Sequence, residues 1–321
     1  MDNDDFSGLS EAFLSWLSNS SATISPKIAI HDLRSRSAGR GVVAVQGIAE
    51  DELLFSVPRG IVLSVANSDL SKTHPEILKE LTDPWLSLIL VLIYEYLRGD
   101  ASPWKPYFDV LPPDFHTLMF WTTNELSELQ ASAVIDKIGK ERADITLKEN
   151  VVSLIRKNAD MFFPPGSNQL SDAKLLSLAH RMGSTIMAYA FDIGSDETSK
   201  EVDEEGYASE DEDEALPKGM VPMADMLNAD ADRNNARLFY ETNSLTMKAL
   251  KPIPTGEEIF NDYGPLPRSD LLRRYGYITP NYAKHDVVEV SAELVLDVIK
   301  TLNPLQEQEI DLRVRTRELK P

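Results

Sequence analysis

Short apolar runs occupy both ends of the chain, and they predict β-strands there. Each run is rich in Val, Ile, Leu or Phe and is bounded by Gly, Pro, Asn or Ser, as strands commonly are. The predicted strands cover residues 28–31, 42–45, 53–57, 61–65, 237–240, 245–249 and 258–260. The polar step Thr242–Ser244 predicts a hairpin turn between two of them.

The middle of the chain has helical spacing instead, with apolar residues three and four positions apart. Helical spacing covers Ser10–Ser20, Pro75–Arg98, 132–159, Asp172–Tyr189 and 291–321. Thr122 lies three residues before Glu125, a pair that predicts a capped helix start. A helical block over residues 75–190 therefore interrupts a β-rich protein.

Two segments break this pattern by placing polar side chains where buried runs end. In Gly219–Asp230 an apolar run leads into Asp225 and Asn228. In Gly256–Tyr277 a strand-like run leads to Tyr263, and a glycine follows this tyrosine. Polar groups at the ends of two buried segments are what a binding pocket requires. Taken alone, however, tyrosines such as Tyr263 are more often packed core aromatics.

Composition narrows the classes of function. The chain has 321 residues, 42% of them hydrophobic, and no cysteine, which excludes disulfides, cysteine nucleophiles and thiolate zinc sites. No apolar run approaches the ~20 residues of a membrane span. The net charge of −20 disfavours direct nucleic-acid binding and favours a basic partner. We expect a monomer that is neither secreted nor membrane-bound.

One segment carries about half of this charge. Residues 195–214 hold eleven acidic residues and one lysine, so we predict that 191–218 is an acidic, disordered loop. The histidines are scattered and predict no metal site. They are His31, His74, His116, His180 and His285.

Five short motifs, taken together and in order, resemble a known family, although no single one of them is specific. GRGVVA, PWKPYFDVLP, GMVPMADMLNADAD, GEEIFNDYG and RRYGY occur in this order between Gly39 and Tyr277. In this order they resemble SET-domain protein-lysine methyltransferases of the Rubisco large-subunit methyltransferase type. The resemblance covers residues 26–300 and is greatest to the fungal ribosomal lysine methyltransferase group, subtype four, with the vertebrate SETD-six type also similar.

The resemblance implies an α+β fold with a β-rich SET core of pseudoknot-like topology, split by a helical insert. The implied parts are residues 1–74 (N-terminal helix and first SET portion), 75–190 (insert), 191–218 (acidic loop), 219–285 (second SET portion) and 286–321 (start of a helical substrate-binding domain). It also implies S-adenosyl-L-methionine as cofactor.

The resemblance further assigns roles to individual residues. Tyr263 matches the catalytic tyrosine. The implied cofactor contacts are Gly39, Arg40, Gly41, Tyr189, Asp225, Asn228, Tyr263 and Tyr275, and the implied lysine-channel residues are Trp121, Tyr240 and Tyr277. Ala229 replaces the family's usual histidine, so a ring contact near the adenine is expected to be lost.

Three functions remain open from the sequence. The first is methylation of a lysine in a ribosomal protein, and the second is methylation of a histone or transcription factor in the nucleus. The third is a catalytically weak SET-fold module that binds a basic partner. The presence of Tyr263, Asn228 and both glycines favours an enzyme, located in the nucleus, the cytoplasm or both.

Overall fold

A computed structural model describes residues 5–36, 38–130, 132–163, 166, 168–194 and 217–302. The chain divides into two compact units, Met1–His285 and Asp286–Pro321. Most of the predicted acidic loop, residues 195–216, lies outside the described residues. No described helix has the length and apolar character needed to cross a membrane.

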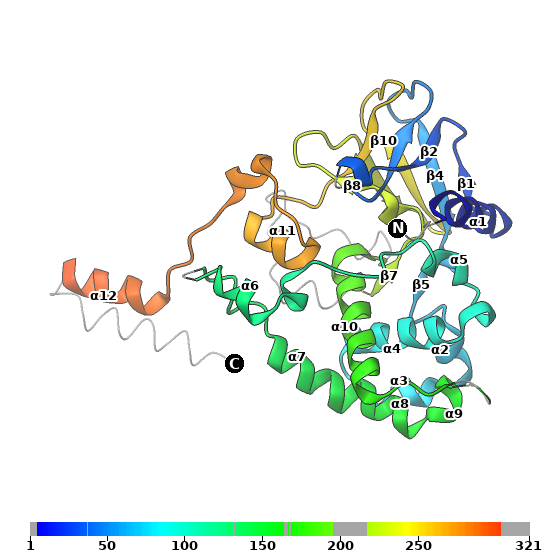
Figure 1. The fold of residues 1–321 in the computed structure, drawn as a ribbon. Coiled ribbons are helices and arrows are strands. Elements are labelled where there is room, and N and C mark those ends of the chain that lie inside the picture. Colours follow the sequence, from blue (N-terminus) through cyan, green and yellow to red (C-terminus); the bar gives the residue numbers. More distant parts are fainter. Residues whose placement is uncertain are drawn as a thin grey trace. The chain divides into compact units, whose positions relative to one another are not determined.

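The first unit contains three small sheets (Figure 1). The first sheet has the order β1 (Thr23–Ile24), β4 (Leu53–Pro58), β10 (Ser244–Ala249), β9 (Ala236–Tyr240). The second has the order β2 (Ile28–Asp32), β3 (Arg40–Ala44), β11 (Glu258–Asn261), β8 (Asn228–Ala229), and the third β5 (Leu63–Ser64), β7 (Lys218–Met220), β6 (Ala190–Asp192). Every sheet pairs strands from both ends of the chain, so neither end forms a core without the other.

The predicted hairpin is present, with Leu245 opposite Tyr240 in the β9–β10 pair. The central strands are buried because their apolar side chains meet in one core. Its strand residues include Val42, Ala44, Leu54, Phe55, Val57, Leu245, Met247, Ala249 and Ile259, each at most 1% exposed.

The helical block has more breaks than its spacing predicts. Its helices are α2 (Asp69–Thr73), α3 (Pro75–Leu78), α4 (Pro84–Leu97), α5 (Lys105–Phe108), α6 (Thr123–Ser127), α7 (Lys140–Thr146), α8 (Ser153–Lys157), α9 (Ala159–Phe162) and α10 (Asp172–Tyr189). The helix predicted over 75–98 is interrupted because Asp83 caps a new helix at Trp85 N and Pro84 occupies its first position. A π-helical stretch, Leu147–Val152, breaks the next one.

Helix α1 (Phe6–Asn19) packs against the start of the helical block. Its Phe13 and Trp16 rings stack on Tyr107 of α5, with ring centroids 6.0 and 6.3 Å away. Phe13 and Tyr107 are fully buried. The N-terminal helix therefore holds the start of the helical block in place through aromatic packing.

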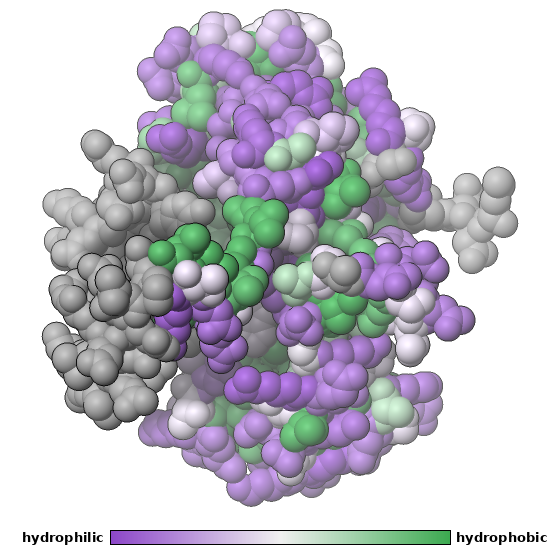
Figure 2. All heavy atoms as spheres, turned by 90° about the vertical axis from the view of Figure 1, so that its left-hand side faces the viewer, coloured by the Kyte–Doolittle hydropathy of each residue, from purple (hydrophilic) through white to green (hydrophobic). Residues whose placement is uncertain are grey.

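The remaining helices are α11 (Arg268–Tyr275) in the first unit and α12 (Ala292–Leu302) in the second. Within its own unit, α12 exposes the apolar residues Leu294, Val295, Val298 and Leu302. Figure 2 shows a surface on which hydrophilic side chains predominate, interrupted by smaller hydrophobic patches.

Candidate active site

The two polar segments singled out in the sequence meet through strand pairing. β8 runs parallel to β11, with Asn228 opposite Phe260. The buried Asn235 fixes this arrangement, because its amide donates to the Glu258 carbonyl at 3.0 Å and its carbonyl accepts from Phe260 N at 2.8 Å. The Asn235 side chain thus satisfies backbone groups of β11 that a neighbouring strand would otherwise pair with. It holds the segment that carries Asn228 beside the strand that leads to Tyr263.

Gly41, Asn228 and Glu258 form a close cluster where β3 meets these strands. Asn228 Nδ2 donates to Glu258 Oε1 at 2.7 Å and to the Arg40 carbonyl at 3.3 Å. A Cβ on Gly41 would lie 2.9 Å from Glu258 Oε1 and 3.0 Å from Asn228 Nδ2. Glycine is therefore required at position 41 by the close approach of this protein's own side chains.

Gly39 and Arg40 have different roles from Gly41. Gly39 has φ of +62° and no atom near an added Cβ, so the backbone conformation alone favours glycine. The Arg40 side chain donates to the Val110 carbonyl at 3.0 Å and lies over the Phe6 ring at 4.5 Å. Arg40 thus contributes its backbone to the cluster, while its guanidinium contacts the helical block and α1.

Asp225 is a buried carboxylate with one hydrogen-bonded oxygen. Tyr107 OH donates to its Oδ2, whereas Oδ1 is buried without a hydrogen-bond partner among the described residues. Burial raises the pKa of Asp225 to about 7, although the hydrogen bond from Tyr107 acts to lower it. Burial also raises the pKa of Tyr107 well above its usual value.

The backbone just before Asp225 is strained. Met223 has φ of +79°, a conformation that non-glycine residues rarely adopt. Such strain costs about 1–3 kcal/mol and is concentrated at functional sites. It turns the chain from the buried run at Val221 into the short 3-10 helix, Ala224–Met226, that presents Asp225.

The tyrosines form a second cluster. Tyr263 follows β11 and stacks on Tyr275 of α11, with centroids 4.1 Å apart and planes 5° apart. Tyr277 packs edge-on against Tyr275 at 6.4 Å. Burial raises the pKa of Tyr263 well above its usual value, and it raises the pKa of Tyr275 and of Tyr277 to about 12. Without a bound ligand, these phenols therefore stay protonated near neutral pH.

Tyr189 is the last residue of α10. Its pKa is raised to about 12, first by burial and then by the charges of Asp225, Tyr277 and Tyr275. Its ring also packs against Phe115, with centroids 6.3 Å apart. Tyr189 is thus close enough to both groups for their charges to affect its ionisation.

Two predicted channel residues lie outside the aromatic contacts of Tyr275. Trp121 Nε1 donates to the His116 carbonyl at 3.0 Å, and this carbonyl group lies against Gly276. Tyr240 has a pKa of about 12, raised by burial and then by Asp192. Its assignment to the channel stays a prediction.

Three contributors to the site were missed in the sequence. The sequence patterns give Tyr107, Glu258 and Phe115 no individual role in the site. Their partners are distant in the chain: Tyr107 and Asp225 are 118 positions apart. The signal available for Tyr107 was its position in an aromatic motif, because buried tyrosine hydroxyls usually find a partner.

The residues present fit a ligand with a cationic group, because the buried Oδ1 of Asp225 offers an acceptor that the described residues leave unused. The described residues contain no cluster of three or more His, Asp or Glu side chains able to hold a metal ion. The carboxylate of Asp262, next to Tyr263 in the chain, accepts from Gly264 N at 2.8 Å and shapes the turn after Tyr263. The site therefore combines the buried carboxylate of Asp225 with a group of tyrosine side chains.

Comparison with known proteins gives consistent matches. A family model for the SET domain matches residues 39–264. Ribosomal lysine N-methyltransferase 4 of Saccharomyces cerevisiae is 39% identical over 306 residues, 92% of this chain and 61% of that protein. N-lysine methyltransferase SETD6 of Bos taurus is 34% identical over 277 residues, 84% of this chain and 57% of that protein. The chain thus spans less than two thirds of these relatives.

Solved structures match the fold. A structure of Rubisco LSMT bound to AdoMet superposes with a TM-score of 0.64 at 24% identity, covering 91% of this chain and 63% of that one. The LSMT SET domain bound to MeLysine and AdoHcy gives a TM-score of 0.66 at 21% identity, covering 89% and 61%. At this level of identity the comparison shows a common α+β fold.

Proposed function

The chain belongs to the SET-domain family, and from that premise we propose that it transfers a methyl group from S-adenosyl-L-methionine to a lysine side chain of a protein. The observation that carries the proposal is the geometry around Tyr263: its ring stacks on Tyr275, and the strand that leads to it is paired with the segment that carries Asn228. The names of the yeast and bovine relatives support the same reaction.

The cofactor would be held by the cluster at the start of β3 and by the segment that follows β7. Gly39–Gly41 would offer backbone groups, and Asn228 is fixed beside them by Glu258. Asp225 would offer a cationic group its Oδ1, which has no hydrogen-bond partner among the described residues. The bound cofactor supplies an electrophilic methyl group on a positively charged sulfur.

The tyrosines would prepare the lysine. An amine attacks carbon only when neutral, and free lysine has a pKa of about 10.4. Placed around the amine, Tyr263, Tyr275 and Tyr277 would exclude water and disfavour the ammonium form, so the proton would leave to solvent before attack. Tyr263 OH would align the neutral amine with the methyl group that the cofactor supplies. Such alignment contributes up to about 7–11 kcal/mol to lowering the barrier.

The substrate we propose is a ribosomal protein. The name of the yeast relative favours it, and the net charge of −20 favours a lysine-rich partner. A nuclear histone or transcription factor is the alternative substrate. A weak SET-fold module that binds a basic protein without transfer is the alternative of another class. Nuclear and cytoplasmic locations agree with each of these.

The Tyr263→Phe variant tests the reaction. We expect unchanged cofactor binding in a calorimetric titration and a methyl-transfer rate at least about 100-fold lower, the scale on which catalysis responds to lost positioning. Tyr282→Phe is the matched control, because Tyr282 is buried and its hydroxyl has no partner among the described residues. Near-normal turnover by Tyr263→Phe would show that Tyr263 is not needed in the mechanism. Absence of cofactor binding by the unmodified protein would refute the proposed methyltransferase activity.

Labelled cofactor separates the substrates. The protein is incubated with ribosomal subunits and, in parallel, with core histones. We expect label in a ribosomal protein, and mass spectrometry then locates the modified lysine. Label confined to histones would reject the ribosomal substrate while leaving lysine transfer intact.

A further inference from the structure

A glycine, a carboxylate and an amide meet on one face of the second sheet. In the β3–β11 pair Glu258 lies opposite Val43, and in the β8–β11 pair Asn228 lies opposite Phe260. Side chains alternate between the two faces of a strand, so Gly41, Glu258 and Asn228 share a face. The register of the sheet therefore sets their approach to one another.

The amide group of Asn228 has one orientation that suits its surroundings. Its Nδ2 donates to Glu258 Oε1 at 2.7 Å and to the Arg40 carbonyl at 3.3 Å. If the two ends of the amide were exchanged, its oxygen would face two acceptors and no donor, and both hydrogen bonds would be lost. The carboxylate of Glu258 therefore helps to fix which end of the amide is used within the protein.

The end of the Asn228 amide that remains is an acceptor. An asparagine side chain offers two N–H donors and one carbonyl oxygen. Nδ2 is directed to acceptors of the chain itself, whereas Oδ1 accepts no hydrogen bond from the described residues. Asn228 is also only partly buried. In this orientation it can accept a hydrogen bond from a ligand but has no donor to offer one.

We propose that Glu258 is a positioning residue for cofactor binding, which holds the Asn228 amide so that Oδ1 accepts a hydrogen bond from a donor group of the cofactor. Glu258 acts through Asn228 and does not need to touch the cofactor. Gly41 belongs to the same arrangement, because a Cβ there would lie 2.9 Å from Glu258 Oε1 and 3.0 Å from Asn228 Nδ2. The inference rests on the proposed methyl transfer and adds selectivity for a donor to its cofactor site.

Glu258→Met tests the role by removing the acceptor while keeping a side chain of similar length. Affinity is measured by calorimetric titration with the reaction product, S-adenosyl-L-homocysteine. We expect about tenfold weaker binding, or about 1.4 kcal/mol, because the amide of Asn228 is then free to turn. Glu257→Met is the matched control, since Glu257 is exposed and its side chain has no hydrogen bond among the described residues. Equal affinities of the two variants would overturn the proposal.

Glu258→Gln separates the hydrogen bond from the charge. Glutamine keeps a carbonyl oxygen that can accept from Asn228 Nδ2, but it carries no negative charge. We expect its affinity for the product to stay within about threefold of that of the unmodified protein. An affinity as low as that of Glu258→Met would overturn the proposal, because the charge of Glu258 would then account for its effect on binding.

The hydrogen bond can also be restored in the opposite direction. In Asn228→Asp two carboxylates face each other without a donor between them. When Glu258→Gln is added, the glutamine amide can donate to the new aspartate, whose second oxygen still offers an acceptor to the ligand. We expect the double variant to bind the product at least about tenfold more tightly than Asn228→Asp alone. No gain in affinity would contradict the positioning role.

Analogues of the product identify the donor and exclude a merely structural role for Glu258. One analogue lacks the α-amino group, and the other lacks both ribose hydroxyls. We expect one of them to bind the unmodified protein about tenfold more weakly than the product, and to lose much less in Glu258→Met. The same loss in both proteins would overturn the proposal, because a structural role weakens the binding of every ligand alike.

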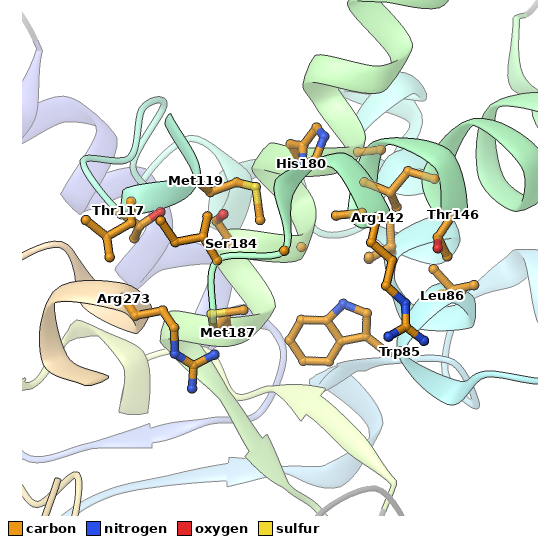
Figure 3. A pocket seen from close by; sticks show the side chains of 18 of the residues that line it. Trp85, Leu86, Thr117, Met119, Arg142, Thr146, His180, Ser184, Met187 and Arg273 are labelled. Carbon is orange, nitrogen blue, oxygen red and sulfur yellow. The ribbon is translucent and has the colours of Figure 1, made fainter. Parts of the chain in front are cut away.

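The cavity beside Trp85 provides the control for general destabilisation. It measures about 320 Å³ and is lined by parts of α4, α7 and α10, by residues 117–119 and by Arg273 of α11 (Figure 3). Its lining includes no residue of β3, β8 or β11. Ile89→Val removes a buried methyl group there and should lower stability without changing the affinity for the product. Binding weakened as much as in Glu258→Met would overturn the proposal.

The outcomes separate this inference from the proposed function. Product binding with the expected order of the Glu258 variants, but no methylation of any protein, would overturn the transfer reaction and leave the positioning role standing. Methyl transfer with equal product affinities in Glu258→Met and Glu257→Met would overturn the positioning role and leave the reaction standing.

Discussion

The hydroxyl of Tyr107 donates a hydrogen bond to the carboxylate of Asp225, a residue 118 positions away in the sequence. Both residues are buried, and Tyr107 is itself held by the Phe13 and Trp16 rings of α1. The contact joins the helical block to the segment that carries the proposed cofactor residues. Placement of Asp225 therefore depends on packing that begins at the N-terminal helix.

The raised pKa of Asp225 predicts a stability that falls as the pH rises. Its pKa is 3.8 in the unfolded chain and about 7 in the folded protein, so the folded state binds the proton more tightly. The resulting stabilisation is fully present below pH 3.8 and is lost as the pH rises through 7. At 1.36 kcal/mol per pKa unit, the full change is at most about 4 kcal/mol.

The Asp225→Asn variant removes this titration. We expect its free energy of unfolding, relative to the unmodified protein, to increase between pH 4 and pH 8 in urea denaturation. Asp230→Asn is the control: burial acts to raise the pKa of Asp230, but Arg233 and backbone hydrogen bonds lower it overall. Asp230 therefore titrates below this range, and the difference between its variant and the unmodified protein should stay nearly constant from pH 4 to pH 8. A constant difference between Asp225→Asn and the unmodified protein across this range would contradict the prediction.

Tyr107→Phe should leave the carboxylate of Asp225 without its side-chain partner while keeping the ring packing. An unsatisfied buried polar group costs about 1–3 kcal/mol, so we expect a loss of that size in the free energy of unfolding at pH 8. The loss should be smaller at pH 5, where Asp225 is protonated. Tyr282→Phe should change stability by less than about 0.5 kcal/mol, because no bond of its hydroxyl is lost. Equal effects of the two variants would show that the Tyr107 hydrogen bond contributes little.

Gly41→Ala should destabilise the fold and weaken cofactor binding together. Its Cβ would lie 2.5 Å from Leu33 Cδ1 and 2.9 Å from Glu258 Oε1, so these side chains must move. Overpacking of this kind costs about 1–3 kcal/mol. Gly47→Ala is the matched control, since no atom lies within 4 Å of its added Cβ. Thermal unfolding and calorimetric titration measure the two effects, and a Gly41→Ala protein indistinguishable from Gly47→Ala would refute the close packing.

Local patterns in the sequence predicted helices and strands well where the apolar residues of a segment follow a single periodicity. Asp172–Tyr189 forms one helix with the predicted bounds, capped by Ser171, because its apolar face is continuous. The strands at 237–240 and 245–249 pair as predicted because the turn between them is short and polar. The capping pair of Thr122 and Glu125 is also present.

Features that depend on distant contacts could not be predicted in this way. The break near Asp83 was missed because apolar spacing continues on both sides of it. The resemblance implies Gly41 as a cofactor contact, but the close approach of Asn228 and Glu258 to this glycine is visible only in the fold. The cavity beside Trp85 is formed by segments that only the fold brings together. The chain order of motifs indicated the family but not these contacts.

Gly276→Ala should be the most disruptive glycine substitution near the tyrosines. Gly276 ends α11 with φ of +79°, and an added Cβ would lie 2.9 Å from the His116 carbonyl carbon, a backbone atom that cannot turn aside. Backbone strain of about 1–2 kcal/mol adds to overpacking of about 1–3 kcal/mol. Gly256→Ala has a similar φ of +88° with no atom within 4 Å, so it measures the strain alone. We expect the Gly276 variant to lose more stability in chemical denaturation and, by displacing the neighbouring Tyr275, to lower kcat/KM as well. Equal losses in the two variants would mean that the loop at His116 yields without disturbing the cluster.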